Sequence, residues 1–218
     1  MNKIFRLCAV TALLTGPSAF ASLIVGEQQF NTGNVLPSPL IASNTDLLQT
    51  SFLSVSGENA SATVRNGSTG TAYANIAPDL AVIWGQTTTT YNLDLSVNTF
   101  GYDISEIRLF SGWSDARAGQ SYQMFYSLVG NAAFTSLGTV SAPQSNGSLL
   151  TRTYDSNNTP ILSGVDAIQF TQINNGSAGT GTVFREFDVL GVATVPETGS
   201  LALLVLGAAF LRLIKPRR

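Results

Sequence analysis

The feature that most constrains the fold is a two-residue alternation of apolar and polar side chains. It is clearest at 91–97, where Tyr91, Leu93, Leu95 and Val97 are separated by Asn92, Asp94 and Ser96. A strand with one buried face has this period. Related patterns predict strands at 104–110, 122–128, 165–173 and 182–190, with shorter candidates at 52–55 and 62–64 and a β-compatible threonine run at 87–90. Because we find no long 3.6-residue period, the chain is predicted to be all-β.

Turn signals separate these segments at short spacing. Asn-Gly pairs favour hairpins because both residues tolerate positive φ. The signals are Asn66-Gly67, Gly112, Asn131, Asn146-Gly147, Asn157-Asn158 and Asn175-Gly176. Strands and turns in this order predict a single β-sandwich or jelly-roll domain over residues 22–194, without a second domain.

The N-terminus has the features of a secretory signal peptide. Lys3 and Arg6 precede a short apolar core at residues 7–14, and Ala19 and Ala21 form an A-x-A cleavage site. We therefore expect residues 1–21 to be removed by signal peptidase. The alternative is a buried N-terminal helix.

The mature body excludes several functional classes. From Ser22 to Val195 it has five Arg, no Lys and twelve acids, a formal charge of −7. Such a body repels nucleic acid and anionic lipid. The chain has no His, and its one Cys, Cys8, lies in the signal peptide. Histidine, lysine and thiol chemistry are therefore excluded, which leaves carboxylate chemistry.

The C-terminus carries a second apolar segment. Residues 195–199 read Val-Pro-Glu-Thr-Gly, an apolar run follows at 201–211, and the chain closes with Arg212, Lys215, Arg217 and Arg218. A helix over about 199–214 would be slightly shorter than the ~30 Å hydrocarbon core of a bilayer. We expect a marginal membrane anchor whose terminal cations stay in the cytoplasm, with the body outside.

This tail resembles a PEP-CTERM sorting signal, in which a Pro-Glu-Pro motif, a short apolar helix and an Arg cluster end the chain. Val195, Pro196 and Glu197 match, and Thr198 replaces the second proline. The resemblance implies an exosortase-like transpeptidase as partner. It also implies a Gram-negative bacterium, with transient residence in the inner membrane and then the cell surface or extracellular matrix as destination.

Two other interpretations of the tail stay open. Pro196 to Gly199 also looks like the core of the LPxTG signal that sortases cut, with Val195 in the place of leucine. The short tail of 195–218 and the lysine-free body favour the PEP-CTERM interpretation. The second alternative is a tail anchor that is never cut.

A second resemblance covers residues 91–191. The segments that carry it are Tyr102 to Ile107, Ser111 to Trp113, Gln120 to Tyr122, Tyr126-Ser127 and Arg185 to Val189. They look like the strands of discoidin-type, galactose-binding-like jelly rolls, although the flanking disulfide of that family is missing. The resemblance implies a jelly-roll fold and, more weakly, glycan binding.

Exposed aromatic rings are the candidate sugar-stacking platforms. Of Tyr73, Trp84, Tyr102, Trp113 and Tyr122, the best placed is Trp113, which has Arg117 and Gln120 nearby. We predict Trp113 and Arg117 as glycan contacts. The alternative is that Trp113 caps the end of the sandwich while Arg117 pairs with an acid.

Two pairs of acids could coordinate Ca²⁺ or act as acid and base in catalysis. They are Asp103 with Glu106, and Glu186 with Asp188. No calcium-loop motif is present, and we interpret them as solvated strand edges or as partners of Arg108 or Arg185. No metal and no cofactor are therefore expected.

These observations lead to three hypotheses of function. The first is a non-catalytic exported protein of the surface or matrix that associates with exopolysaccharide. The second is a carboxylate-dependent glycan hydrolase or lyase, which requires two facing carboxyls. The third is a purely structural matrix protein.

Overall fold

Ten antiparallel strands account for most of what the computed structural model describes, namely residues 23–30, 46–49, 52–56, 62–68, 81–83, 87–143, 147–157, 159–174 and 181–195. The strands are β1 Leu23–Phe30, β2 Phe52–Ser56, β3 Ala81–Ile83, β4 Thr87–Asn92, β5 Tyr102–Trp113, β6 Gln120–Leu128, β7 Asn131–Ala142, β8 Gly147–Asp155, β9 Leu162–Asn174 and β10 Thr182–Ala193. Three short 3₁₀ helices are also described, at Leu47–Gln49, Ala62–Arg65 and Ala116–Ala118.

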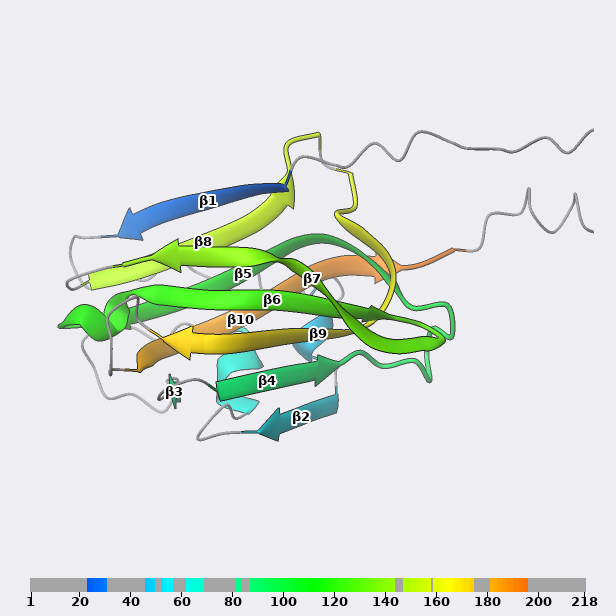
Figure 1. The fold of residues 1–218 in the computed structure, drawn as a ribbon, viewed down its shortest axis with the longest axis horizontal. Helices are drawn as coiled ribbons and strands as arrows, with labels where there is room; N and C mark the ends of the chain where they lie inside the picture. Colours follow the sequence, from blue (N-terminus) through cyan, green and yellow to red (C-terminus); the bar gives the residue numbers. More distant parts are fainter. Residues whose placement is uncertain are drawn as a thin grey trace, which may run out of the picture.

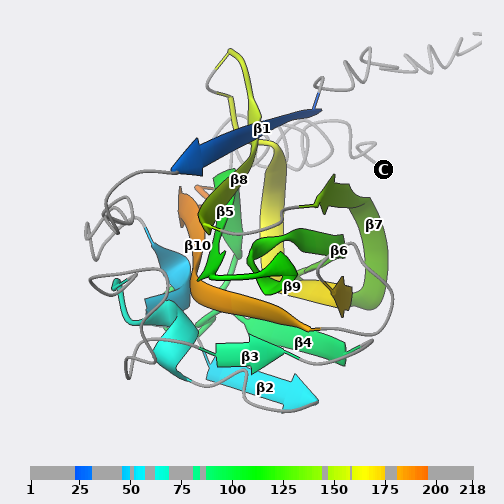
Figure 2. The ribbon, with the colours of Figure 1, turned by 90° about the vertical axis from the view of Figure 1, so that its left-hand side faces the viewer.

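The strands form two layers. One layer has the order β1-β8-β5-β10-β3, and the other has the order β7-β6-β9-β4-β2. The start of β5 joins the layers by pairing with β9, with Tyr102 opposite Val165 and Ile104 opposite Leu162. Figures 1 and 2 show the resulting sandwich. The predicted all-β class is confirmed.

Aromatic rings fill the space between the layers. Phe170 on β9 meets Phe187 on β10 at a centroid distance of 5.2 Å, in an edge-to-face arrangement. Tyr91 and Tyr122 pack on Phe170 from β4 and β6, and Phe184 packs on Phe187. All five side chains are buried. Burial of large side chains from both layers is the main force that joins them.

Four predicted strands lie within longer observed ones. Residues 104–110 lie in β5, 122–128 in β6, 165–173 in β9 and 182–190 in β10. The segment 52–55 lies in β2 and the threonine run in β4. In β6 buried and partly exposed residues alternate from Gln120 to Met124, so the apolar alternation marks the buried face, whereas β10 is buried on both faces from Thr182 to Gly191.

Three sequence predictions are wrong. The strand expected at 91–97 ends at Asn92 because Ser96 donates from its backbone N and its hydroxyl to Asp94, which closes a turn. The segment 62–64 forms part of a 3₁₀ helix, not a strand. Gly112, expected in a turn, lies inside β5, where it is buried.

Strands β1, β3, β7 and β8 were not predicted. Much of β7 is exposed and rich in Ala, Ser, Thr and Gly, so it has little apolar alternation. In β8 the burial is almost continuous, which removes the period of two.

The predicted signal peptide, its cleavage site at Ala19 and Ala21, and the tail beyond Val195 lie outside the described residues. Within the part of the chain that is described, no helix has the length and apolar character needed to cross a membrane.

Candidate functional site

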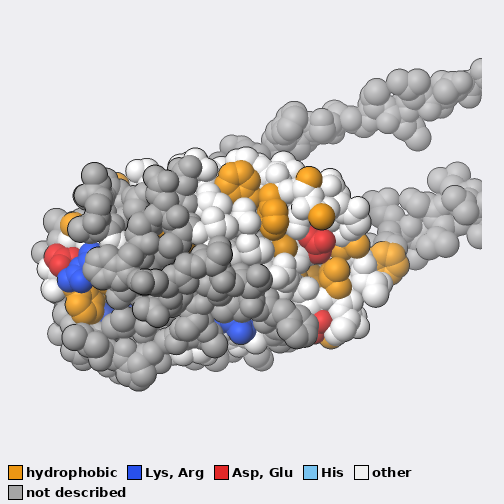
Figure 3. All heavy atoms as spheres, turned by 60° about the horizontal axis from the view of Figure 1, so that its bottom comes forward, with side chains coloured by type: hydrophobic (Ala, Val, Ile, Leu, Met, Phe, Trp, Pro, Cys, Tyr) orange, Lys and Arg blue, Asp and Glu red, His pale blue; other side chains and the backbone are white. Residues whose placement is uncertain are grey.

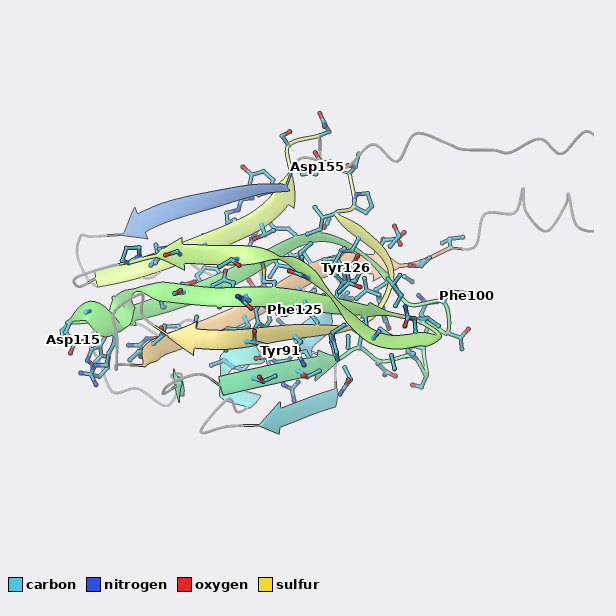
Figure 4. The ribbon with its side chains drawn as sticks, viewed as in Figure 1. Tyr91, Phe100, Asp115, Phe125, Tyr126 and Asp155 are labelled. Atoms are coloured by element: carbon cyan, nitrogen blue, oxygen red, sulfur yellow. The ribbon has the colours of Figure 1, made fainter. Side chains whose placement is uncertain are left out.

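The first candidate site is a cluster where β5 ends, formed by Trp113, Asp115 and Arg117. Asp115 caps the 3₁₀ helix Ala116–Ala118, because its carboxylate accepts a hydrogen bond from the backbone N of Arg117 at 2.9 Å. The same carboxylate accepts from Arg117 Nε and Nη2, at 2.9 and 2.7 Å. We call these three residues the tip cluster. Figure 4 shows Asp115 at the left-hand end of the sandwich.

Arg117 also lies over the indole of Trp113. Its guanidinium carbon is 5.1 Å from the ring centroid, within the range of a cation–π contact. The hydrogen bond from Arg117 lowers the pKa of Asp115, and the same bond raises the pKa of Arg117. Both side chains are therefore charged at neutral pH.

The two predicted glycan contacts thus lie together, although the pairing of Arg117 with an acid is the arrangement expected under the alternative. Trp113 is half-buried, and one of its faces is occupied by Arg117. The part of the Trp113 indole that Arg117 does not cover is partly exposed to solvent. Beside it lie the Asp115 carboxylate, an acceptor, and the Arg117 guanidinium, a donor, held in fixed geometry. This combination suits a polar ligand with adjacent hydroxyl groups.

Gln120 and the two other described candidate aromatics have structural roles. Gln120 is buried, and its Nε2 donates to the carbonyls of Leu109 and Leu149 and to Ser111 Oγ, at 3.0, 3.2 and 2.9 Å. Tyr102 and Tyr122 are buried as well. Tyr73 and Trp84 lie outside the described residues.

The second candidate site is a buried cluster of three carboxyls, Asp46, Glu186 and Asp188, which we call the acid cluster. One oxygen of each lies within 4.8 Å of the others, and each residue is at most 1% exposed. The interpretation of Glu186 and Asp188 as solvated strand edges is therefore wrong. Strand β10 is covered on both of its faces from Thr182 to Gly191, so the two-residue spacing places both carboxyls in the interior.

Backbone groups hold two of the three carboxyls. Asp46 Oδ1 accepts from the backbone N of Leu48 at 3.1 Å and of Val189 at 3.2 Å. Glu186 Oε1 accepts from the N of Gly67 at 2.8 Å. Among the described residues, Asp46 Oδ2, Glu186 Oε2 and both oxygens of Asp188 have no hydrogen-bond partner.

Burial changes the protonation of the acid cluster. It raises the pKa of Glu186 to about 9 and that of Asp188 to about 7, and it raises the pKa of Asp46. Glu186 therefore keeps a proton at neutral pH unless a cation replaces it. Carboxylate oxygens are the ligands that Ca²⁺ prefers, so these three residues are the described ones that could hold a divalent cation.

The interpretation of Glu106 as a partner of Arg108 is confirmed. Glu106 accepts from Arg108 Nε at 2.7 Å and from Arg152 Nε at 2.5 Å. Burial raises the pKa of Glu106, but the hydrogen bonds from the two arginines outweigh it, and the net shift is downward. Asp103 instead accepts from the hydroxyl of Thr194 at 2.7 Å.

The sequence indicated only two of the three residues of the acid cluster. Its spacing on β10 pointed to Glu186 and Asp188, but Asp46 is 140 residues away along the chain from Glu186 and joins through an isolated bridge with Leu190. The Asn66-Gly67 pair, expected in a hairpin, instead follows a 3₁₀ helix. Gly67 has a φ of 79°, and its N–H is presented to Glu186.

Comparison with known proteins gives distant structural likenesses. No family profile and no curated protein matches the chain. A family 32 carbohydrate-binding module of Clostridium perfringens NanJ, solved with galactose, is 14% identical; the alignment covers 66% of this chain and 97% of that one, with a TM-score of 0.44. An F5/8 type C domain from Bacteroides fragilis is 8% identical over 66% and 93%, with a TM-score of 0.44. A fucolectin from Morone saxatilis serum is 12% identical over 67% and 48%, with a TM-score of 0.45.

Proposed function

We propose that this protein is a non-catalytic, exported β-sandwich protein that binds glycan through the tip cluster. The main support for this proposal is that the tip cluster lies at the end of the sandwich opposite the exit of the C-terminal tail. Strand β5 runs from Tyr102, beside the exit of the C-terminal tail, to Trp113, so the two ends are about 36 Å apart at the rise of a strand. A tail at one end would leave the tip cluster facing outward (Figure 4).

The chemistry of the tip cluster supports a carbohydrate ligand. A partly exposed indole offers apolar contact to the C–H face of a sugar, while Asp115 and Arg117 offer an acceptor and donors to its hydroxyls. The mature body carries a formal charge of −7, which favours neutral glycans over anionic polymers. Exopolysaccharide is the glycan class that we propose.

The positions of the acids favour binding over hydrolysis. A glycosidase needs two carboxyls that face each other across an open cleft. Of the described acids, Glu106 and Asp115 are engaged by arginines, and Asp155 accepts from the N of Asn157 at 2.8 Å in the turn after β8. The acid cluster is closed to solvent. This distribution weighs against the hydrolase or lyase alternative.

We further propose that the two ends of the chain direct export. Signal peptidase would cut after Ala21, and an exosortase-like transpeptidase would cut near Pro196 and Glu197. Position supports this second step: Thr194 is tied to the fold by its N–H to the Gly101 carbonyl at 2.9 Å, while Val195 is 77% exposed. The motif would therefore begin where the chain leaves the domain and a membrane protease could reach it.

Glycan binding is tested by titrating the mature protein with galactose and with exopolysaccharide, and by comparing the Trp113→Ala variant with Phe100→Ser, a change at the opposite end. We expect Trp113→Ala to lose binding and Phe100→Ser to keep it. Absence of binding by the unmodified protein on a broad glycan array, with normal surface display, would favour the purely structural alternative.

Cleavage of the tail is tested by mass spectrometry of the secreted protein. We expect residues 201–218 to be removed; their retention would favour an uncut anchor.

A further inference from the structure

Exposed large hydrophobic side chains gather at the end of the sandwich that the C-terminal tail leaves. Six of those described lie in its loops, at the end of β6 and at or just after the end of β10, and we call them the basal patch: Val97, Phe100, Leu128, Val129, Val192 and Val195. Their exposure runs from 36% for Leu128 to 82% for Val97. Phe134, which is 39% exposed, lies just beyond the β6–β7 turn. Figure 3 shows such side chains gathered toward the right-hand end.

Hydrogen bonds fix the loops that carry the basal patch. Thr194 joins two of them, because its N–H donates to the Gly101 carbonyl at 2.9 Å and its hydroxyl accepts from the Gly164 N at 3.2 Å. The loop of Val129 is joined through Gly164, whose carbonyl accepts from the Val129 N at 2.9 Å. Gly101 has a φ of 81°, and a side chain there would meet the Gly164 backbone at 2.7 Å. The patch is therefore a rigid surface presented by close backbone packing.

The absence of basic residues around the basal patch determines which kind of lipid it would contact. No Lys or Arg occurs in residues 93–101, 128–131, 159–164 or 192–195, whereas Asp94 lies in the first of these loops. Anionic lipid would be repelled, because lipid headgroups of that kind are bound through basic residues. An apolar, base-free surface suits neutral, zwitterionic lipid.

The sequence places a membrane segment next to this surface. Only five residues lie between Val195 and Leu201, where the apolar run begins, and the six extended Cα–Cα steps that join the two reach about 20 Å. Once the run 201–211 is in a bilayer, the end of β10 is held within that distance of the hydrocarbon, close to the headgroup region.

We propose that the basal patch rests on the outer surface of a neutral lipid bilayer while the tail is still uncut, so that the domain sits on the membrane with its tip cluster outward. This inference rests on the insertion of the tail, which is part of the proposed function. Contact of Phe100 and Val97 with the interface adds apolar burial to a tail that is short for an anchor. It also holds Pro196 and Glu197 at the membrane surface.

Fluorescence quenching in vesicles tests the contact. The mature chain, 22–218, has no Cys, so single substitutions Leu204→Cys, Phe100→Cys and Ser114→Cys each give one labelling site. Each variant is labelled with an environment-sensitive fluorophore and reconstituted in phosphatidylcholine vesicles that contain a lipid quencher. We expect loss of fluorescence at Leu204 and at Phe100, and none at Ser114, which is the matched exposed control near the tip cluster.

The outcomes separate the two proposals. Quenching at Leu204 with Phe100 as unquenched as Ser114 would overturn the membrane contact and leave the anchored tail intact. No quenching at Leu204 would overturn tail insertion and, with it, this inference. Replacing Val97 and Phe100 by Ser in the chain labelled through Val129→Cys is a second check. Weaker quenching at residue 129 supports the contact, and unchanged quenching contradicts it.

Discussion

The carboxyl of Glu186 on β10 accepts a hydrogen bond from the backbone N of Gly67, 119 residues earlier in the chain, at 2.8 Å. This contact fixes one oxygen of the acid cluster, while burial raises the pKa of the group to about 9. A buried carboxyl with such a pKa makes stability depend on pH in a direction opposite to that of an ordinary ion pair.

We predict that the free energy of unfolding falls as the pH rises from about 5 to about 8, by at most about 1.4 kcal/mol per pH unit for each proton involved. In this window the folded protein keeps a proton on Glu186 that the unfolded chain releases. Glu186→Gln should flatten the dependence, because the amide stays neutral. Urea denaturation in EDTA at several pH values measures it.

Asp94→Asn is the control for this experiment, because Asp94 lies outside the cluster and its pKa is lowered by hydrogen bonds from Ser96. It should leave the slope in this window unchanged. A slope that is identical in wild type and Glu186→Gln would contradict the prediction. A melting temperature that rises with added CaCl₂ would indicate that a cation replaces the protons.

The network around Glu106 should have the opposite dependence on pH. Its pKa is lowered, so its stabilisation is present above the ordinary value of 4.5 and is lost as the pH falls through the folded pKa. We expect Glu106→Gln to cost about 1–3 kcal/mol at neutral pH and much less in acid. Asp115→Asn, in a more exposed pair, should cost no more than about 1 kcal/mol. Equal costs in the two variants would contradict the role of Glu106.

Two glycines with positive φ provide a test of the packing at the base. Gly101 and Gly130 have φ values of 81° and 80°, but only Gly101 has neighbours that a methyl group would strike. We expect Gly130→Ala to cost about 1–2 kcal/mol from backbone strain alone, and Gly101→Ala to cost more. Thermal unfolding measures both. If the two substitutions cost the same, the close approach of Gly101 to Gly164 is not important for stability.

The tip cluster predicts how binding responds to substitution. If Trp113 is the aromatic anchor of a glycan site, Trp113→Ala should weaken binding by about 30-fold, equivalent to roughly 2 kcal/mol. Arg117→Met keeps an aliphatic contact over the indole but removes the donors, so it should lower affinity for hydroxyl-rich ligands. Calorimetry on the mature protein measures both changes. Unchanged affinity in Arg117→Met would show that the guanidinium does not contact the ligand.

The alternation and turn signals of the sequence determined the fold class and the position of most long strands. They worked best for β6, where buried and partly exposed residues alternate from Gln120 to Met124, because burial of one face requires a period of two. They failed for β8, which is buried almost throughout, and at Asp94, whose side chain ends a strand through a local turn. The sequence alone also indicated that Trp113 and Arg117 could act together, because only three residues separate them.

Only the tertiary structure decided which residues far apart in the sequence come into contact. Asp46, Gly67 and Glu186 are far apart in the chain and meet because segments from the N-terminal third cover one face of β10, while Phe187 on the same strand packs into the core between the layers. The basal patch is likewise assembled from separate loops by the contacts of Gly101, Gly164 and Thr194. Periodicity records which face of a strand is buried, but not which distant group will lie against it, and the latter depends on long-range pairing of strands.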